Sequence, residues 1–140
     1  MQSEAQLIIS VLEFLRSRKF RYLMAGGANT VFGYLIGVVM YEVLSPKYSI
    51  WIIGFYSNVI AITFSFVTYK LFVFKTQGLW IAEYLKSYLV YGSMALIGMV
   101  FLWVYVDLMN MTIWLAQGLV IISTVVLSYV GHSRVTFRRK

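Results

Sequence analysis

The chain has 140 residues, of which 61% are hydrophobic and only 12% charged, and its mean hydropathy is +0.79. Soluble domains carry about 25% charged residues, so this composition indicates a protein surrounded mostly by hydrocarbon, with no length left for a separate soluble enzyme domain. The net charge is +7, and the basic residues lie beside hydrophobic segments, which favours topology signals and lipid contacts over nucleic-acid binding. The lack of cysteine and the single histidine argue against disulfides, a metal site or a cofactor.

Residues 1–18 are predicted to form an amphipathic helix on the membrane surface. Ile8, Val11, Leu12 and Leu15 recur at helical spacing, and polar residues occupy the opposite face. The segment is too short and too polar to span a bilayer. We therefore expect an interfacial anchor, with docking of a partner protein as the alternative.

Four apolar segments follow, each long enough to cross a bilayer. They cover about residues 22–44, 50–69, 87–106 and 112–132, joined by a turn at 45–49, a polar connection at 70–86 and a turn at 107–111. Of the twelve Lys and Arg residues, all but Lys47 lie in the N-terminal flank, the middle connection or the C-terminal tail. The positive-inside rule then places both termini and the middle connection in the cytoplasm.

The second half of the chain repeats the first, at an offset of 65 residues before the hairpin turn and 63 after it. The matched pairs include Arg21 with Lys86, Gly27 with Gly92, Gly33 with Gly98, Glu42 with Asp107, Trp51 with Trp114 and Ser65 with Ser128. Each unit has two spans, so the copies share one orientation and are related by an axis along the membrane normal. We predict an all-α integral membrane protein of four transmembrane helices, built as two tandem helical hairpins of parallel orientation (20–75 and 85–138) within a domain at 19–140.

Polar side chains inside the spans are the best pointers to function, because hydrocarbon disfavours them. Asn29 and Asn58 are candidates to line a substrate path or, equally, to join helices by hydrogen bonds. A candidate site for a lipid phosphate comprises the basic residues at one predicted depth: Arg21, Lys70, Lys86 and Arg134. The alternative to a phosphate site is that the same four residues are topology signals whose long side chains extend to the membrane–water interface. The sequence contains no recognisable catalytic constellation, so no enzyme activity is expected.

Two further acids, Glu42 and Asp107, stand at the predicted outer ends of spans one and three. They are interpreted as interfacial acids, with cation coupling as the alternative. The third candidate function is that of a small multidrug exporter, a class of protein that also has four short spans. Such exporters generally need a carboxylate embedded in span one, and Glu42 lies only at the end of that span.

Two sequence elements resemble the GtrA-like family. The run Phe20–Thr30 (FRYLMAGGANT) is similar to the opening signature of that family, and Ser65–Phe74 (SFVTYKLFVF) is similar to the element that ends its second span. Ser128–Phe137 is that element again, and the resemblance covers about residues 19–138. It implies translocation of a polyprenyl-phosphate-linked monosaccharide, such as one carried by undecaprenyl phosphate, across the bacterial inner membrane for cell-surface polysaccharide modification.

The resemblance also implies a path for the sugar and a set of partners. Its expected lining comprises Asn29, Asn58, Ser65, Tyr69, Ser128 and His132, the last four standing where the family often has Asn. The expected partners are the lipid-linked sugar and membrane lipids, with a polyprenyl-phosphate glycosyltransferase and a second copy of the chain as further candidates. The alternative function is a scaffold that recruits such a glycosyltransferase through the N-terminal helix.

Overall fold

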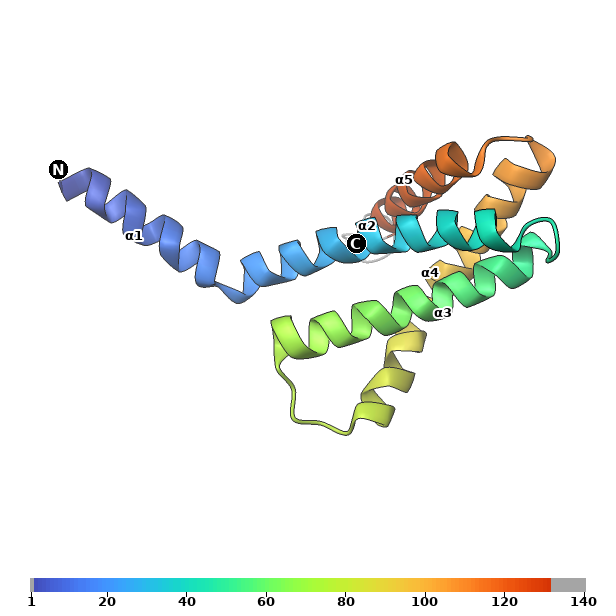
Figure 1. The fold of residues 1–140 in the computed structure, drawn as a ribbon. Helices are drawn as coiled ribbons and strands as arrows, with labels where there is room; N and C mark the ends of the chain where they lie inside the picture. The colour runs from blue at the N-terminus through green and yellow to red at the C-terminus, as the bar shows by residue number, and fades with distance from the viewer. Residues whose placement is uncertain (1, 132–140) are drawn as a thin grey trace, which may run out of the picture.

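The computed structural model describes residues 2–131, with side chains over residues 3–127, and this part of the chain is helical with no strand (Figure 1). The α-helices are α1 (Gln2–Arg16), α2 (Arg18–Leu44), α3 (Ile50–Thr68), α4 (Trp80–Trp103) and α5 (Ile113–Gly131). Two π-helical segments, η1 (Tyr69–Phe74) and η2 (Val104–Leu108), continue α3 and α4. The all-α fold class is thereby confirmed.

Three continuous helical stretches are long and apolar enough to cross a membrane: Arg18–Leu44, Ile50–Phe74 and Trp80–Leu108. A shorter apolar stretch, Ile113–Leu127, is the fourth. Their outward faces carry large apolar side chains, such as Leu89, which is 81% exposed. Such faces suit lipid contact, so the structure is that of a small multi-pass membrane protein.

Ser17 separates α1 from α2. Its hydroxyl donates to the carbonyl oxygen of Phe14 (2.6 Å) at the end of α1 and accepts from the backbone N–H of Phe20 (3.2 Å) at the start of α2. This is the N-cap geometry that Ser favours. Helix α1 contacts only α2 among the described helices and projects away from the others (Figure 1).

The connection between spans two and three is shorter than the predicted 70–86 segment. Residues 70–74 continue the helix as η1, and α4 already begins at Trp80, which leaves a loop at 75–79. Lys75 ends η1 with a left-handed φ of 50°. The predicted extent was wrong because Lys70 and Glu83, which make the segment polar, pair with each other on the two helices.

Helices α2 to α5 form a closed ring in which α2 contacts α3, α3 contacts α4, α4 contacts α5, and α5 contacts α2. Both short turns, at residues 45–49 and 109–112, lie at the same end of the ring, here called the turn end (Figure 1). The opposite end, where α1 joins α2 and η1 meets α4, is called the basic end. Two tandem helical hairpins of the same orientation place both of their turns at one end of the bundle, as is found here.

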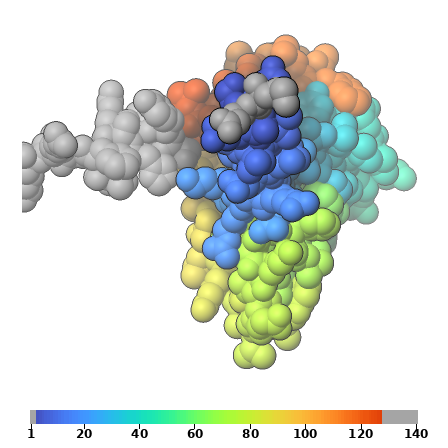
Figure 2. Space-filling view, turned by 90° about the vertical axis from the view of Figure 1, so that its left-hand side faces the viewer, coloured from blue at the N-terminus to red at the C-terminus, as the bar shows by residue number. Residues whose placement is uncertain are grey.

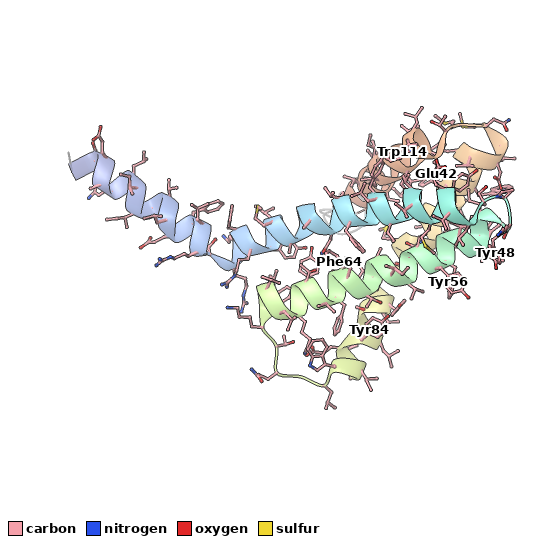
Figure 3. The ribbon with its side chains drawn as sticks, in the orientation of Figure 1. Glu42, Tyr48, Tyr56, Phe64, Tyr84 and Trp114 are labelled. Atoms are coloured by element: carbon pink, nitrogen blue, oxygen red, sulfur yellow. The ribbon has the colours of Figure 1, made fainter. Side chains whose placement is uncertain are left out.

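The turn end is filled with apolar side chains. Six buried residues from α2, α3, α4, η2 and α5 form one cluster: Val38, Ile50, Leu102, Val106, Ile113 and Ala116. The Tyr34 hydroxyl donates to the carbonyl oxygen of Trp114 (3.0 Å), which ties α2 to α5 beside this cluster. Figure 3 shows Glu42 and Tyr48 at this end and Tyr84 toward the other. The bundle is therefore sealed at the turn end.

Candidate functional site

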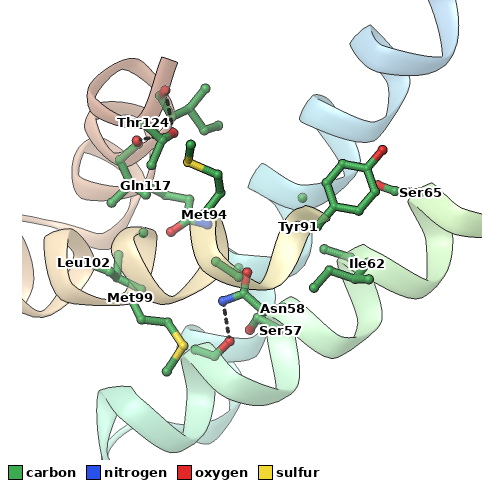
Figure 4. Close-up of a pocket in the computed structure, with 18 of the residues that line it drawn as sticks. Ser57, Asn58, Ile62, Ser65, Tyr91, Met94, Met99, Leu102, Gln117 and Thr124 are labelled. Atoms are coloured by element: carbon green, nitrogen blue, oxygen red, sulfur yellow. Dashed lines mark hydrogen bonds between the residues drawn. The ribbon is translucent and has the colours of Figure 1, made fainter. Parts of the chain in front are cut away.

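A cavity of about 330 Å³ lies between the helices of the ring (Figure 4). All of α2, α3, α4 and α5 contribute to its wall, and glycines on each of the first three leave the space open. The polar residues that line it are Asn29, Ser57, Asn58, Ser65, Tyr91, Gln117 and Thr124. None of the described residues in this lining carries a charge.

Several of these polar groups bond to their own helices. The Ser57 hydroxyl donates to the carbonyl oxygen of Ile53 (2.7 Å), and the Asn58 amide donates to that of Gly54 (2.8 Å; Figure 4). The Thr124 hydroxyl is likewise directed at backbone carbonyls of α5. Back-bonding of this kind occupies donors that would otherwise face the cavity.

Asn29 and Gln117 differ from the others. Both amide atoms of Asn29 and the Oε1 atom of Gln117 are shielded and have no hydrogen-bond partner among the described residues. The Gln117 amide lies against Gly37, where a Cβ atom would come within 2.7 Å of the Gln117 Cδ atom. Gly37 therefore makes room for this amide, and the cavity wall contains two carboxamides, on α2 and α5, whose shielded atoms have no partner among the described residues.

The cavity continues toward the basic end through two neighbouring hollows. The first, of about 480 Å³, shares Asn29, Ser65 and Tyr91 with the cavity and is also lined by Tyr69. The second, of about 170 Å³, shares Tyr69 and Tyr91 with the first and reaches Lys70 and Glu83. A row of polar side chains thus runs from the middle of the bundle to the basic end.

Lys70 lies at the outer limit of this row, with its side chain only 3% exposed. Its ammonium group forms an ion pair with Glu83 and donates to the Thr76 hydroxyl (3.0 Å) and the Gly78 carbonyl (3.1 Å). The same nitrogen lies 5.0 Å from the centre of the Trp80 ring. Lys70 therefore fastens the 75–79 loop to η1 and α4 in this conformation.

The other predicted phosphate residues are placed differently. Arg21 is half-buried on α2, and its Nε atom has no partner among the described residues. Lys86 is exposed on α4, one helical turn after Glu83. Arg134 lies outside the described residues. Figure 2 views this basic end, with the segment around residues 70–80 along its lower edge.

A comparison with protein families identifies the fold. Residues 21–137 match the family described as "GtrA/DPMS, transmembrane domain". The chain belongs to this family. The match spans most of the 140 residues and confirms the GtrA-like resemblance carried by Phe20–Thr30 and Ser65–Phe74. Comparisons with curated proteins and with solved structures gave no match.

Of the predicted path residues of this GtrA/DPMS-family chain, Asn29, Asn58 and Ser65 line the central cavity, and Tyr69 lies in the adjoining hollows. The side chains of Ser128 and His132 lie outside the described residues. Glu42 and Asp107 are exposed near the turn end, and neither lines the cavity.

Sequence reasoning did not select several residues of the site, among them Glu83 and Gln117. Glu83 was assigned to a polar loop, although it is an acid within a cluster of basic residues, and that contrast was a usable signal. Gln117 is a carboxamide inside a predicted span, as Asn29 and Asn58 are, and the same argument applied to it.

Proposed function

We propose that this protein moves a polyprenyl-phosphate-linked monosaccharide, with undecaprenyl phosphate as the expected carrier, across the bacterial inner membrane. The observation that supports the proposal is a polar cavity that continues to the basic end and is sealed by apolar residues at the turn end. A sugar and a phosphate must cross about 30 Å of hydrocarbon. Polar groups inside the bundle lower that barrier by replacing water as hydrogen-bond partners.

In this proposal the basic end faces the cytoplasm and admits the lipid headgroup. The sugar enters the cavity beside Asn29 and Asn58, and the polyprenyl chain remains in the bilayer. Arg21 is the best-placed phosphate ligand among the described basic residues, because it is half-buried at the basic end, no described residue pairs with its Nε atom, and a guanidinium suits phosphate oxygens. Lys70 joins it only when Glu83 releases the ammonium group. No covalent bond is made or broken, so the proposed activity is not enzymatic.

Transport is tested with the purified protein in liposomes that contain a labelled polyprenyl-phosphate sugar. A reagent added outside measures how fast the inner-leaflet lipid becomes accessible. We expect the wild-type protein to accelerate this exposure and Arg21→Ala to abolish the acceleration. Lys47→Ala removes an exposed cation at the turn end and should transport at the wild-type rate.

Two results would contradict the proposal. The first is an exposure rate equal to that of protein-free liposomes when the reconstituted wild-type protein is helical and inserted. The second is full activity in Arg21→Ala, which would remove the phosphate role assigned to that residue.

A scaffold that recruits a glycosyltransferase is the second candidate, and α1 favours it. This helix projects from the bundle with large apolar residues exposed, including Leu7 (68%) and Phe14 (51%). Deletion of residues 1–15 separates the two functions. A transporter retains lipid exposure in liposomes after the deletion, whereas a scaffold loses sugar transfer in cells and shows no lipid exposure in either form.

A further inference from the structure

We propose that the central cavity selects a neutral sugar and excludes sugars that carry an amino or carboxylate charge. This inference rests on the proposed function and specifies its substrate class. It depends on two properties of the cavity, namely the lack of charge among its described lining residues and a pair of carboxamides that have unpaired atoms among those residues.

The first property is the absence of a counter-charge. The described lining residues include no Asp, Glu, Lys, Arg or His. The nearest ion pair, between Lys70 and Glu83, lies in a separate hollow toward the basic end and is mutually satisfied. A charge on the sugar, in addition to the phosphate charge that all of these lipids share, would therefore lose its water without gaining a counter-charge among the described lining residues, which is strongly unfavourable in a membrane interior.

The second property is the chemistry of the free polar groups. Both amide atoms of Asn29 on α2, and the Oε1 atom of Gln117 on the neighbouring helix α5, are shielded and lack a partner among the described residues, so a small side-chain rotation would let them bond to a sugar. A carboxamide both donates and accepts, as each sugar hydroxyl does, so the two are matched without charge. A site built to hydrogen-bond hydroxyl groups discriminates against substrates that leave it unpaired.

The size and the apolar part of the wall agree with this assignment. A volume of about 330 Å³ is at the lower end of the range for ligand pockets, which suits one sugar ring rather than an oligosaccharide. Ile53, Met94 and Met99 also line the cavity, and Figure 4 shows the two methionines. Their apolar surface can pack against the C–H face of a sugar ring.

The test uses wild-type protein in liposomes with three polyprenyl-phosphate lipids that differ only in the sugar. One carries a neutral hexose, one an amino hexose and one a uronic acid. At a pH low enough to protonate the amine, we expect the neutral lipid to be exposed at least about 100-fold faster than either charged lipid. Raising the pH until the amine is neutral should recover transport of the amino hexose, while the uronic acid stays excluded.

A charge placed in the cavity provides the second measurement. Gln117→Glu should raise the rate for the protonated amino hexose relative to the neutral hexose by at least about tenfold. Asn29→Asp adds the same charge from α2 and is the companion variant if Gln117→Glu does not fold. Gln6→Glu makes the identical chemical change on exposed α1 and should leave the ratio of rates unchanged.

The outcomes separate the two proposals. Equal exposure of all three lipids by the wild-type protein, or faster exposure of a charged lipid, overturns the selectivity and leaves transport in place. An unchanged ratio in folded Gln117→Glu and Asn29→Asp shows that the sugar does not enter this cavity and also overturns it. Exposure of none of the three lipids overturns the transport function itself.

Discussion

The two ends of the bundle are built from different kinds of residue, although the same four helices pass through both. At the turn end, Val38, Leu102 and Ala116 are buried against one another. Toward the basic end the helices enclose a cavity and two hollows lined by Asn29, Ser65, Tyr69 and other polar residues. The internal repeat makes the two hairpins similar, so it does not explain a difference along the bundle axis.

The difference is one of packing. Apolar contacts hold the turn end, and dispersion favours such dense contact. At the basic end, the Lys70–Glu83 ion pair and the hydrogen bonds of Lys70 fasten the 75–79 loop to the helices beside it. A protein that opens alternately to each side needs both ends to change. The basic end, which the two hollows reach, is the more open end in this conformation.

The largest effect is expected from breaking the Lys70–Glu83 pair. Glu83→Leu leaves an ammonium group whose side chain is only 3% exposed without its counter-ion, whereas Lys70→Met leaves a carboxylate that is 29% exposed and can be hydrated. We expect Glu83→Leu to be the more destabilising change, and the double variant to recover much of the loss. Unfolding in detergent, followed by circular dichroism, measures all three.

The same variants separate two roles of Lys70. If Lys70 also binds the lipid phosphate, the double variant Lys70→Met with Glu83→Leu is folded and does not transport. Transport at the wild-type rate in the double variant would restrict Lys70 to fastening the loop. Equal destabilisation by the two single variants would contradict the burial argument.

A smaller effect comes from adding the same volume at each end. Ala116 at the turn end is 0% exposed, so Ala116→Leu overpacks the cluster and should destabilise the fold by about 1–3 kcal/mol. Ala95 lines the cavity, so Ala95→Leu enters space that is already open. We expect Ala95→Leu to retain stability and to slow transport by filling the cavity. Comparable losses of stability in both variants would show that the cavity is not open in the membrane.

The sequence predicted the helices well because composition and length decide them. Four apolar stretches and the turn at 45–49 follow from hydropathy and turn residues. The predicted connection at residues 70–86 was too long because Lys70 and Glu83, which make it polar, lie on helices and pair with each other. Residues 13 positions apart leave no periodic signal in the sequence. Asn29 and Asn58 were chosen because amides in a span are unfavourable, and that argument needs no structure.

The roles of individual polar groups could not be predicted in this way. Ser57, Thr124 and Asn58 bond to their own helices, whereas Asn29 and Gln117 remain unpartnered among the described residues. All five are polar residues within apolar helices. Helix rotation and the space beside each side chain decide between the two outcomes, and both depend on the packing of neighbouring helices.

The smallest effect is expected from adding a single methyl group beside Gln117. Gly37→Ala places a Cβ atom where the Gln117 amide lies, but that amide ends a flexible side chain and can move. We therefore expect little change in stability and a reduced rate for the neutral sugar lipid. Gly92→Ala is the matched control, because no described atom lies within 4 Å of its added Cβ and alanine favours a helix by up to about 1 kcal/mol.

Measuring both stability and transport rate shows whether Gly37→Ala acts through the Gln117 amide. A slower rate in Gly37→Ala with normal transport in Gly92→Ala links the position of the Gln117 amide to sugar passage. Equal slowing in both variants would instead attribute the effect to reduced helix flexibility, because both changes remove a glycine from a spanning helix. Rates unaffected in both would show that the sugar passes without contacting Gln117.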